Sequence, residues 1–323
     1  MYSLIVVDYN SIEITIEYIK HCKQFLTEAG ASHVVIIENG HEENVVASIV
    51  RHFGDYQIKN ILEIEQTIYC FTKDDQEICY CHSGGNVGFA KGNNLGIKIA
   101  EKIWADEFYI VSNNDLVFKK VFDLSVAESL FRNHLNIGVI GPRVATPEGK
   151  LQTPRRWQNA FQRLIFNQWV GVIGGVFGRR VRERLYDRLS YDTIMDAESG
   201  NCDWIIGCFM IIRAAAFHRA GMFDKNTFLY AEEMILSKRM EAAGYSIYYC
   251  KDLEVIHNHA QTTKKALAAF RMVEIDFESN YYFYKTYKHT SPVLLGLAKV
   301  SFWLYRTLFK AKQSVKHWLR KAK

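Results

Sequence analysis

The chain has 323 residues, of which 49% are hydrophobic and 23% are charged, with only 20 glycines and 4 prolines. This composition excludes disordered, collagen-like and low-complexity proteins, and the length allows one large domain or two small ones. The seven cysteines include no Cys-x-x-Cys pair, which argues against a zinc site and a disulfide scaffold and favours reduced cysteines inside a cell.

The net charge of +5 is concentrated at the C-terminal end. Glu278 is the last acidic residue, and the ten Lys or Arg residues after it leave 30 basic and 35 acidic side chains in residues 1–278. A mildly acidic body argues against a nucleic-acid partner. At the other end, Met1 leads directly into the apolar run Leu4–Val7, so we predict no targeting signal and expect a cytoplasmic protein.

Short apolar runs that end in polar residues alternate with helical patterns in the first third of the chain. The predicted strands are Leu4–Tyr9, Val34–Ile37, Tyr69–Phe71, Ile78–Tyr80 and Phe108–Val111, and the predicted helices are Ser11–Thr27, Glu43–Phe53 and Gly92–Lys102. This alternation predicts an α/β fold with a mostly parallel central sheet, whose ligands bind at the carboxyl ends of the strands.

The second part of the chain is less regular. Strand patterns return at Val139–Gly141, Trp204–Ile212 and Ser246–Tyr249, with a helix at Met234–Ala243. Residues 151–200 are rich in arginine and show no clear strand, which is typical of an insertion of helices and loops. We therefore expect one domain over residues 1–260, with an insertion at 151–200, and a helical extension over residues 261–323.

The helical extension combines an apolar stripe with basic residues. The stripe recurs every three or four positions and consists of Leu297, Val300, Leu304, Leu308, Ala311, Val315 and Trp318. Lys299 and Arg306 interrupt any run long enough to cross a bilayer, so we expect the helix to lie in the plane of an anionic membrane surface. The alternative is a helix packed on its own domain or on a partner subunit. Aromatic residues at 281–287 could likewise pack in the core or form the face of a homodimer.

Asp115 follows a predicted buried strand in the sequence Ser-Asn-Asn-Asp. A carboxylate at this position could hold a Mg²⁺ or Mn²⁺ ion that bridges two phosphates, because these cations prefer oxygen ligands. Taken alone, Asn-Asn-Asp is also an ordinary turn sequence.

Residues 84–94 form a glycine- and asparagine-rich loop before a helix. Glycines allow a backbone to approach a ligand, and the start of a helix favours anions. The loop has neither the ending of a Walker loop nor the spacing of a dinucleotide-binding loop, and an ordinary loop is the alternative.

Glu232 and Glu233 follow the aromatic-rich segment Phe228–Ala231. One of the two carboxylates could remove a proton from an attacking hydroxyl group. The alternative is a charged first helical turn, which the helix dipole stabilises.

In their order and spacing, these segments resemble the family 2 glycosyltransferases, which are inverting enzymes of the GT-A fold, over residues 3–260. The most specific match is Asn86–Gly96 (NVGFAKGNNLG), which fits the family's Asn-x-Gly-Phe-Ala-x-Gly-Asn-Asn-x-Gly. Ser112–Asp115 resembles the Asp-x-Asp motif as it occurs in rhamnosyltransferase-like members. The segment 223–239 resembles the one that carries the base, although Glu233 stands where the family has Asp and Ile235 replaces a later Asp.

The resemblance implies roles for individual residues. It implies that Glu233, with Glu232 beside it, is the catalytic base and that Asp115, with His257, meets the metal. It places the acceptor near Asp203, Trp204 and Gly207, and the arginines of the insertion, Arg155 and Arg156 first, suggest an acceptor that carries phosphate. The donor nucleotide-sugar is expected to contact Asp8, Tyr9, Asn10, Glu38, Asn39, Asn86, Gly88, Phe89, Lys91, Asn93, Asn94, Asn113 and Asn114.

The implied activity is transfer of a sugar from a dTDP- or UDP-linked donor to a glycan or lipid-linked acceptor in polysaccharide synthesis. Mg²⁺ or Mn²⁺ is the expected cofactor, and the expected location is the inner face of the membrane. Because Glu233 and Ile235 depart from the motif, a catalytically inactive sugar-nucleotide-binding or scaffold subunit is the alternative. A nucleotidyltransferase would need a glycine- and arginine-rich loop after the first strand, where Asp8–Ser11 stands instead.

Overall fold

The computed structural model describes residues 1–27, 30–41, 43–170, 172, 180–181, 192–195, 197–258 and 266–321, with the backbone alone at 266–269 and 310–321. The chain divides into two compact units. The first consists of residues 1–156 and 193–268, and the second of residues 157–192 and 269–323. The predicted functional boundary at residue 260 stays a prediction.

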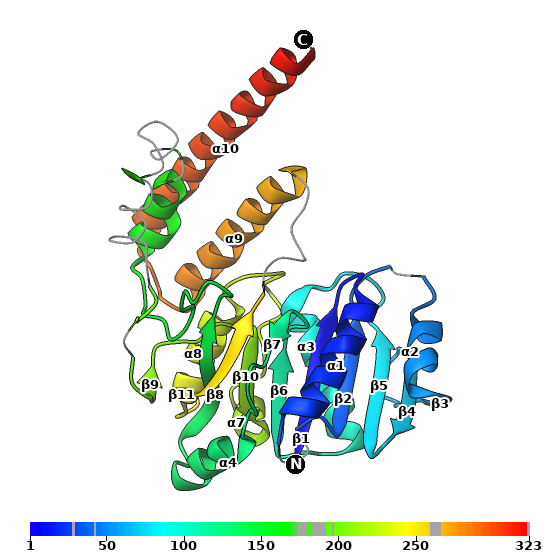
Figure 1. Ribbon diagram of the computed structural model, residues 1–323. Coiled ribbons are helices and arrows are strands. Elements are labelled where there is room, and N and C mark those ends of the chain that lie inside the picture. The colour runs from blue at the N-terminus through cyan, green and yellow to red at the C-terminus, as the bar shows by residue number, and fades with distance from the viewer. Residues whose placement is uncertain are drawn as a thin grey trace. The chain divides into compact units, whose positions relative to one another are not determined.

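The first unit is built on one large mixed sheet (Figure 1). Its central strands β5, β2, β1 and β6 are parallel, and β10 joins them to the parallel pair β8 and β11 by antiparallel pairing. The strand order is β3-β4-β5-β2-β1-β6-β10-β8-β11-β7, with β9 paired to β11. The strands are β1 (Tyr2–Asp8), β2 (His33–Glu38), β3 (Tyr56–Lys59), β4 (Ile68–Lys73), β5 (Gln76–His82), β6 (Phe108–Ser112), β7 (Leu116–Val117), β8 (Ile137–Ala145), β9 (Gly200–Cys202), β10 (Phe209–Arg213) and β11 (Ser246–His257).

Helices cover both faces of this sheet, as Figure 1 shows for α1 and α3. Alternate residues of a strand point to opposite faces, so Leu4 and Val6 pack with α1, α2 and α4 while Ile5 packs with α3, α7 and α8. The helices are α1 (Ile12–Phe25), α2 (Val45–Phe53), α3 (Gly88–Ile103), α4 (Leu124–Asn133), α7 (Ala214–Arg219) and α8 (Glu232–Ala242). The predicted α/β fold is confirmed.

Two differences from the sequence prediction affect the site. Helix α3 begins at Gly88, inside the glycine-rich loop, so most of that loop's asparagines lie on a helix. Strand β11 continues to His257, well beyond the predicted end at Tyr249, and its last residues pair with β7. This extension places His257 beside the segment that carries Asp115.

The second unit contains a π-helical turn, η1 (Gln162–Phe166), and the helices α9 (Ala266–Thr286) and α10 (Pro292–Lys321). Helix α10 packs on α9 by stacking Phe302 on Phe277, with 4.0 Å between ring centroids. In the aromatic cluster, Phe283 and Tyr284 are buried, which favours packing in the core for these two; a homodimer stays a prediction. Within the described residues, no helix is long and apolar enough to span a bilayer.

Candidate functional site

Asp8 ends β1 with a carboxylate that is fully buried. It accepts hydrogen bonds from the Ser11 amide and hydroxyl (3.1 and 2.7 Å), the Thr15 hydroxyl (2.6 Å) and the Asn114 amide (3.3 Å). Asn114 also donates to Ser11 and Thr15. Asp8 and Asn114 therefore fasten the start of α1 to the loop that carries Asp115. Their direct contact with a ligand stays a prediction.

Glu38, at the end of β2, lies in register with Asp8 and His82 on the neighbouring strands. The ring of His82 accepts the Gly84 N–H at Nδ1 (3.1 Å), so Nε2 carries the proton; it donates to the Gly40 carbonyl (3.2 Å) and lies 3.3 Å from Glu38 Oε2. The other oxygen, Oε1, is buried and has no hydrogen-bond partner among the described residues. Asn39 is similar, because its amide donates to the Gly88 carbonyl (3.0 Å) while its buried Oδ1 has no partner in the described part of the chain.

The first two residues after β1, Tyr9 and Asn10, are both exposed. Tyr9 is half exposed. Asn10 adopts a left-handed backbone (φ 53°) and accepts the His41 N–H at 2.8 Å, which joins the β1 and β2 loops. A Cβ on Gly40 would lie 2.2 Å from Asn10 Oδ1, so this close approach requires glycine.

The glycine-rich segment docks on the segment before α8. Gly88 has φ +82°, and a Cβ there would lie 2.1 Å from the Phe228 carbonyl oxygen, which accepts the Phe89 N–H at 3.0 Å. The Asn94 side chain pairs with both backbone groups of Phe223, at 2.9 and 3.2 Å. The motif therefore has a structural task of its own, which is to fix the position of the chain that leads to Glu233.

Other members of the motif lie around this contact. Asn86 accepts the Gly88 N–H at 3.1 Å, and Lys91 is exposed. Asn93 is buried, donates to the Phe89 carbonyl at 3.0 Å, and has an Oδ1 without a partner among the residues described. These groups hold the first turn of α3.

Glu233 lies in the first turn of α8, after left-handed backbone at Tyr230 and Ala231. Its Oε1 accepts the Gly207 N–H at 3.2 Å. A Cβ on Gly207 would stand 3.4 Å from that oxygen and 3.5 Å from the Phe89 ring, so the carboxylate, the glycine and the aromatic ring converge. Glu232, by contrast, is buried.

Asp115 and His257 meet at the end of the sheet. The Asp115 carbonyl accepts the Asn258 N–H at 2.9 Å, and His257 Nε2 lies 3.3 Å from Asp115 Oδ1. On the other side of the ring, Nδ1 lies 2.9 Å from Gln152 Oε1. An amide oxygen can only accept, so Nδ1 donates to it, and in the neutral ring the Nε2 lone pair is then directed toward Asp115.

This arrangement fits a divalent cation. Asp115 Oδ1 is buried and forms no hydrogen bond with the described residues, and an imidazole lone pair faces it. A carboxylate oxygen and a neutral imidazole nitrogen are both ligands of first-row divalent metals. No group of three His, Cys, Asp or Glu side chains suited to a metal occurs among the residues described.

Cys208 lies between the two carboxylates. Its carbonyl accepts the Asn113 N–H at 2.9 Å. Burial raises the pKa of the Cys208 thiol, the carboxylates of Asp115 and Glu233 raise it further, and Arg155 opposes them. Because Gly207, the neighbour of Cys208 in the chain, donates its N–H to Glu233, the segment 207–208 contacts both the loop that carries Asp115 and the Glu233 carboxylate.

Arg155 and Trp204 form the side of the site where the acceptor is expected. The Arg155 guanidinium carbon lies 5.1 Å from the centre of the Trp204 ring, and Arg155 Nε donates to the Gln152 carbonyl at 2.8 Å. The indole N–H donates to the Arg156 carbonyl at 3.2 Å, and the Arg156 side chain is exposed. The Asp203 carbonyl accepts the Ser237 hydroxyl, which ties this segment to α8.

No protein family model matches the sequence. The N-acetylglucosaminyl-diphospho-decaprenol L-rhamnosyltransferase of Mycobacterium tuberculosis is 24% identical over 188 residues, which are 56% of this chain and 59% of that protein. The chain thus spans little more than half the length of that relative. The low-salt glycan biosynthesis hexosyltransferase Agl10 of Haloferax volcanii is 24% identical over 303 residues, which are 91% of this chain and 90% of the relative.

The fold has a solved counterpart. The crystal structure of GalNAc-T7 with UDP, GalNAc and Mn²⁺ superposes with a TM-score of 0.53 at 11% identity, over 88% of this chain and 49% of that one. The chain is a relative of glycosyltransferases and has the GT-A fold.

With the GT-A fold established, the predicted residues sort by position. The structure pairs Asp115 with His257 and Glu233 with Gly207. By contrast, the polar groups of Asp8, Asn114 and Asn94 form hydrogen bonds within the protein. Two residues were missed from the sequence. Gln152 and His82 belong to no motif, and only the contacts with His257 and Glu38 identify them.

Proposed function

We propose that this GT-A protein is an inverting glycosyltransferase, which moves a sugar from a dTDP- or UDP-linked donor to a hydroxyl of a glycan or lipid-linked acceptor in cell-surface polysaccharide synthesis. The observation that carries the proposal is that one short segment, Gly207 and Cys208, contacts both carboxylate-bearing segments: the Gly207 N–H holds Glu233, and the Cys208 carbonyl accepts the N–H of Asn113, two residues before Asp115. Asp115 in turn faces His257. In this proposal, Asp115 acts on the diphosphate of the sugar donor and Glu233 acts on the hydroxyl group of the acceptor. The relationship to glycosyltransferases supports the reaction class.

The donor's nucleoside occupies the ends of β1 and β2. Glu38 Oε1 and Asn39 Oδ1 are buried hydrogen-bond acceptors without partners among the described residues. A buried acceptor without a partner destabilises the fold until an N–H or O–H group donates to it. The ribose hydroxyls and the base N–H groups of a nucleotide are such donors. Tyr9 is exposed enough beside them to stack on a base.

Asp115 and His257 would hold Mg²⁺ or Mn²⁺, which would neutralise the negative charge of the leaving nucleoside diphosphate. Gln152 orients the His257 ring: by accepting from Nδ1 it selects the neutral tautomer in which Nε2 is free to face Asp115. The mutual position of the two ligands is therefore fixed by the protein.

Glu233 takes the proton of the acceptor hydroxyl as that oxygen attacks the anomeric carbon. The Gly207 N–H orients the carboxylate at 3.2 Å, and a positioned base of this kind contributes about 10²–10⁴-fold in rate. Attack from the face opposite the leaving group inverts the configuration of the sugar. Arg155, stacked on Trp204, binds a phosphate on the acceptor.

The proposal includes binding of the second unit, through α10, to the inner face of the membrane. Four residues of the predicted stripe are 44–57% exposed, namely Leu297, Val300, Leu304 and Leu308. Trp303, on the same helix, is 60% exposed. The opposite side of α10 packs on α9 through Phe302 and an ion pair between Arg306 and Glu274 (3.1 Å). An apolar face that this unit leaves uncovered, next to basic residues, fits an anionic lipid surface.

Thermal melting with nucleotides tests the catalytic proposal. The protein is heated with UDP, dTDP, GDP or CMP, each with and without Mn²⁺. We expect stabilisation by UDP or dTDP that increases with the metal, by about 2.7 kcal/mol at a hundredfold excess over the dissociation constant. Absence of a shift with all four contradicts the proposal. Binding without product formation from UDP- and dTDP-sugars favours the inactive binding subunit.

A further inference from the structure

Cys70 and Cys79 form a pair of thiols remote from the proposed reaction. They lie directly opposite each other on the antiparallel strands β4 and β5. A two-residue turn at Asp74 and Asp75, both with positive φ (48° and 62°), joins these strands. The two Sγ atoms are 2.7 Å apart, with one thiol donating to the other. Since opposed residues have Cβ atoms about 4.5–5.5 Å apart and a disulfide needs about 3.5–4.5 Å, a small local shift suffices for a bond.

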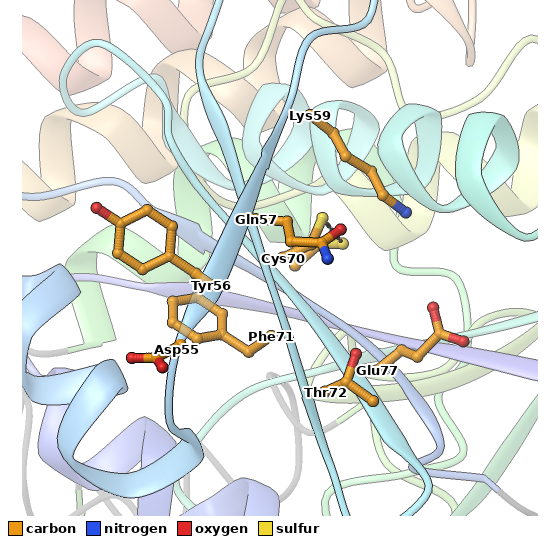
Figure 2. A pocket seen from close by; sticks show the side chains of 9 residues that line it. Asp55, Tyr56, Gln57, Lys59, Cys70, Phe71, Thr72 and Glu77 are labelled. Atoms are coloured by element: carbon orange, nitrogen blue, oxygen red, sulfur yellow. Dashed lines mark hydrogen bonds between the residues drawn. The ribbon is translucent and has the colours of Figure 1, made fainter.

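Cys70 is partly exposed, whereas Cys79 is buried behind it. A pocket of about 340 Å³ opens on it, with Lys59, Cys70, Thr72, Glu77 and Cys79 among its lining residues. Figure 2 shows the labelled side chains of Lys59, Thr72 and Glu77 around Cys70. Strand β3, which contributes Lys59, is exposed along its whole length at the edge of the sheet. A small organic molecule can therefore reach the Cys70 sulfur from this pocket, and Cys79 needs to reach only the sulfur of Cys70.

The two thiols differ in acidity. The hydrogen bond from Cys79 and the nearby Lys59 lower the pKa of Cys70, while the same bond and burial raise the pKa of Cys79. All seven cysteines are described, and burial raises the pKa of Cys22, Cys81, Cys202, Cys208 and Cys250. Cys70 is also the partly exposed member of the pair and Cys79 the buried one, so Cys70 meets the reagent first and Cys79 is its partner.

We infer that Cys70 and Cys79 are a site of reversible disulfide formation by exchange with a small organic disulfide. The Cys70 thiolate attacks one sulfur of the reagent, and the other half leaves as a thiolate that takes up a proton. Cys79 then loses its proton and attacks the Cys70 sulfur, which releases the second half as a thiol. Two electrons pass from the cysteines to the reagent, and two cysteine thiols and one disulfide become one protein disulfide and two small thiols. The inference does not depend on the proposed function.

Glutathione exchange followed by peptide mapping tests this site. The full chain is incubated with oxidised glutathione and quenched in acid, and its free thiols are counted. We expect the loss of two thiols, a peptide in which Cys70 and Cys79 are joined, and full recovery in excess reduced glutathione. A pair that stays free, or stable glutathione adducts without the internal link, overturns the inference.

Single substitutions assign the order of the steps. Cys79→Ser should leave a stable glutathione adduct on Cys70, and Cys70→Ser should leave Cys79 unreacted. Cys81→Ser is the matched control, because Cys81 lies on the same strand opposite Ile68 and should leave the cross-link unchanged. Lys59→Met should slow the first step. Equal cross-linking in Cys70→Ser and wild type, through any other cysteine, contradicts the assignment.

Discussion

His257 Nε2 lies 3.3 Å from Asp115 Oδ1, at the point where β11 pairs with β7. The backbone reinforces this contact, since the Asn258 N–H donates to the Asp115 carbonyl at 2.9 Å. Because His257 is 4% exposed and Asp115 Oδ1 is buried, the imidazole and the carboxylate face each other away from bulk water. Under the proposed function, both would be ligands of the divalent cation.

Gln152→Leu should weaken Mn²⁺ binding by about 10–100-fold, the usual effect of removing a group that orients a ligating histidine. The leucine cannot accept the Nδ1 proton of His257, so the ring loses its fixed orientation. The measurement is the Mn²⁺ concentration dependence of the nucleotide-induced melting shift, with the electron paramagnetic resonance of free Mn²⁺ as a second readout.

Gln152→Glu is the matched variant, because its carboxylate oxygen can still accept from Nδ1. We expect it to restore Mn²⁺ affinity toward the wild-type value, while both variants keep the wild-type melting temperature within about 2 °C in the absence of ligand. Equal Mn²⁺ affinity in wild type and Gln152→Leu would show that Gln152 does not position the histidine.

Glu233→Gln should reduce kcat by about 10²–10⁴-fold while nucleotide and Mn²⁺ binding stay at wild-type levels. The amide side chain can still accept the Gly207 N–H, so the site keeps its shape and loses only its base. Single-turnover transfer to the acceptor measures the effect. Glu232→Gln, at the neighbouring buried carboxylate, separates the two acids, and a loss confined to Glu232→Gln would reverse their assignment.

The strands of the fold were predictable where apolar runs are short and bounded by polar residues. Residues 4–9, 34–37 and 108–111 match β1, β2 and β6 because those strands are buried on both faces. Strand β3 was missed because all four of its residues are exposed, which removes the hydrophobic signal. The end of β11 was missed because the charged residues Lys251, Asp252 and Glu254 interrupt its apolar pattern.

The candidate site was predictable only in part. Motif order and spacing identified Asp115, Glu233 and Gly207, which the fold brings to one place. Patterns could not tell which motif residues face inward. Asp8 and Asn94 match family positions, yet they hydrogen-bond within the protein. Gln152 carries no pattern at all, because its partner is distant in the sequence and only the folded chain brings the two together.

Gly88→Ala should destabilise the protein by about 3 kcal/mol or more, because the added Cβ meets backbone in addition to adopting an unfavourable φ. The atom in its way is the Phe228 carbonyl oxygen, at 2.1 Å. Relief of that clash separates the glycine-rich segment from the chain leading to Glu233, so nucleotide-dependent activity should fall as well. Urea unfolding gives the free energy of unfolding.

Gly84→Ala is the matched control for Gly88→Ala. It separates the cost of the left-handed backbone from the cost of the clash with Phe228. Gly84 has φ +86°, nearly that of Gly88, but a Cβ there meets no described atom within 4 Å. We expect it to cost only the left-handed strain, about 1–2 kcal/mol. Equal losses in the two variants would mean that the contact between Gly88 and Phe228 does not hold the site together.

The exposed stripe of α10 should determine binding to lipid vesicles. The triple variant Leu297→Ser, Leu304→Ser, Leu308→Ser removes three apolar side chains that are 44–56% exposed. Since burying one leucine contributes about 1.5 kcal/mol or more, partitioning into vesicles of phosphatidylcholine and phosphatidylglycerol should fall by more than about 100-fold. Flotation on a density gradient measures it.

The control for this experiment changes exposed leucines of the first unit. Leu62 and Leu135 are 104% and 73% exposed, so Leu62→Ser and Leu135→Ser remove comparable apolar surface without touching α10. Vesicle binding of this control variant should stay at the wild-type level. Added salt should weaken the binding of both the control variant and wild type, since basic residues contribute through attraction to anionic lipid. Equal flotation of the α10 variant and wild type would exclude the stripe as the membrane contact. Loss of binding in the control variant alone would assign the contact to the first unit.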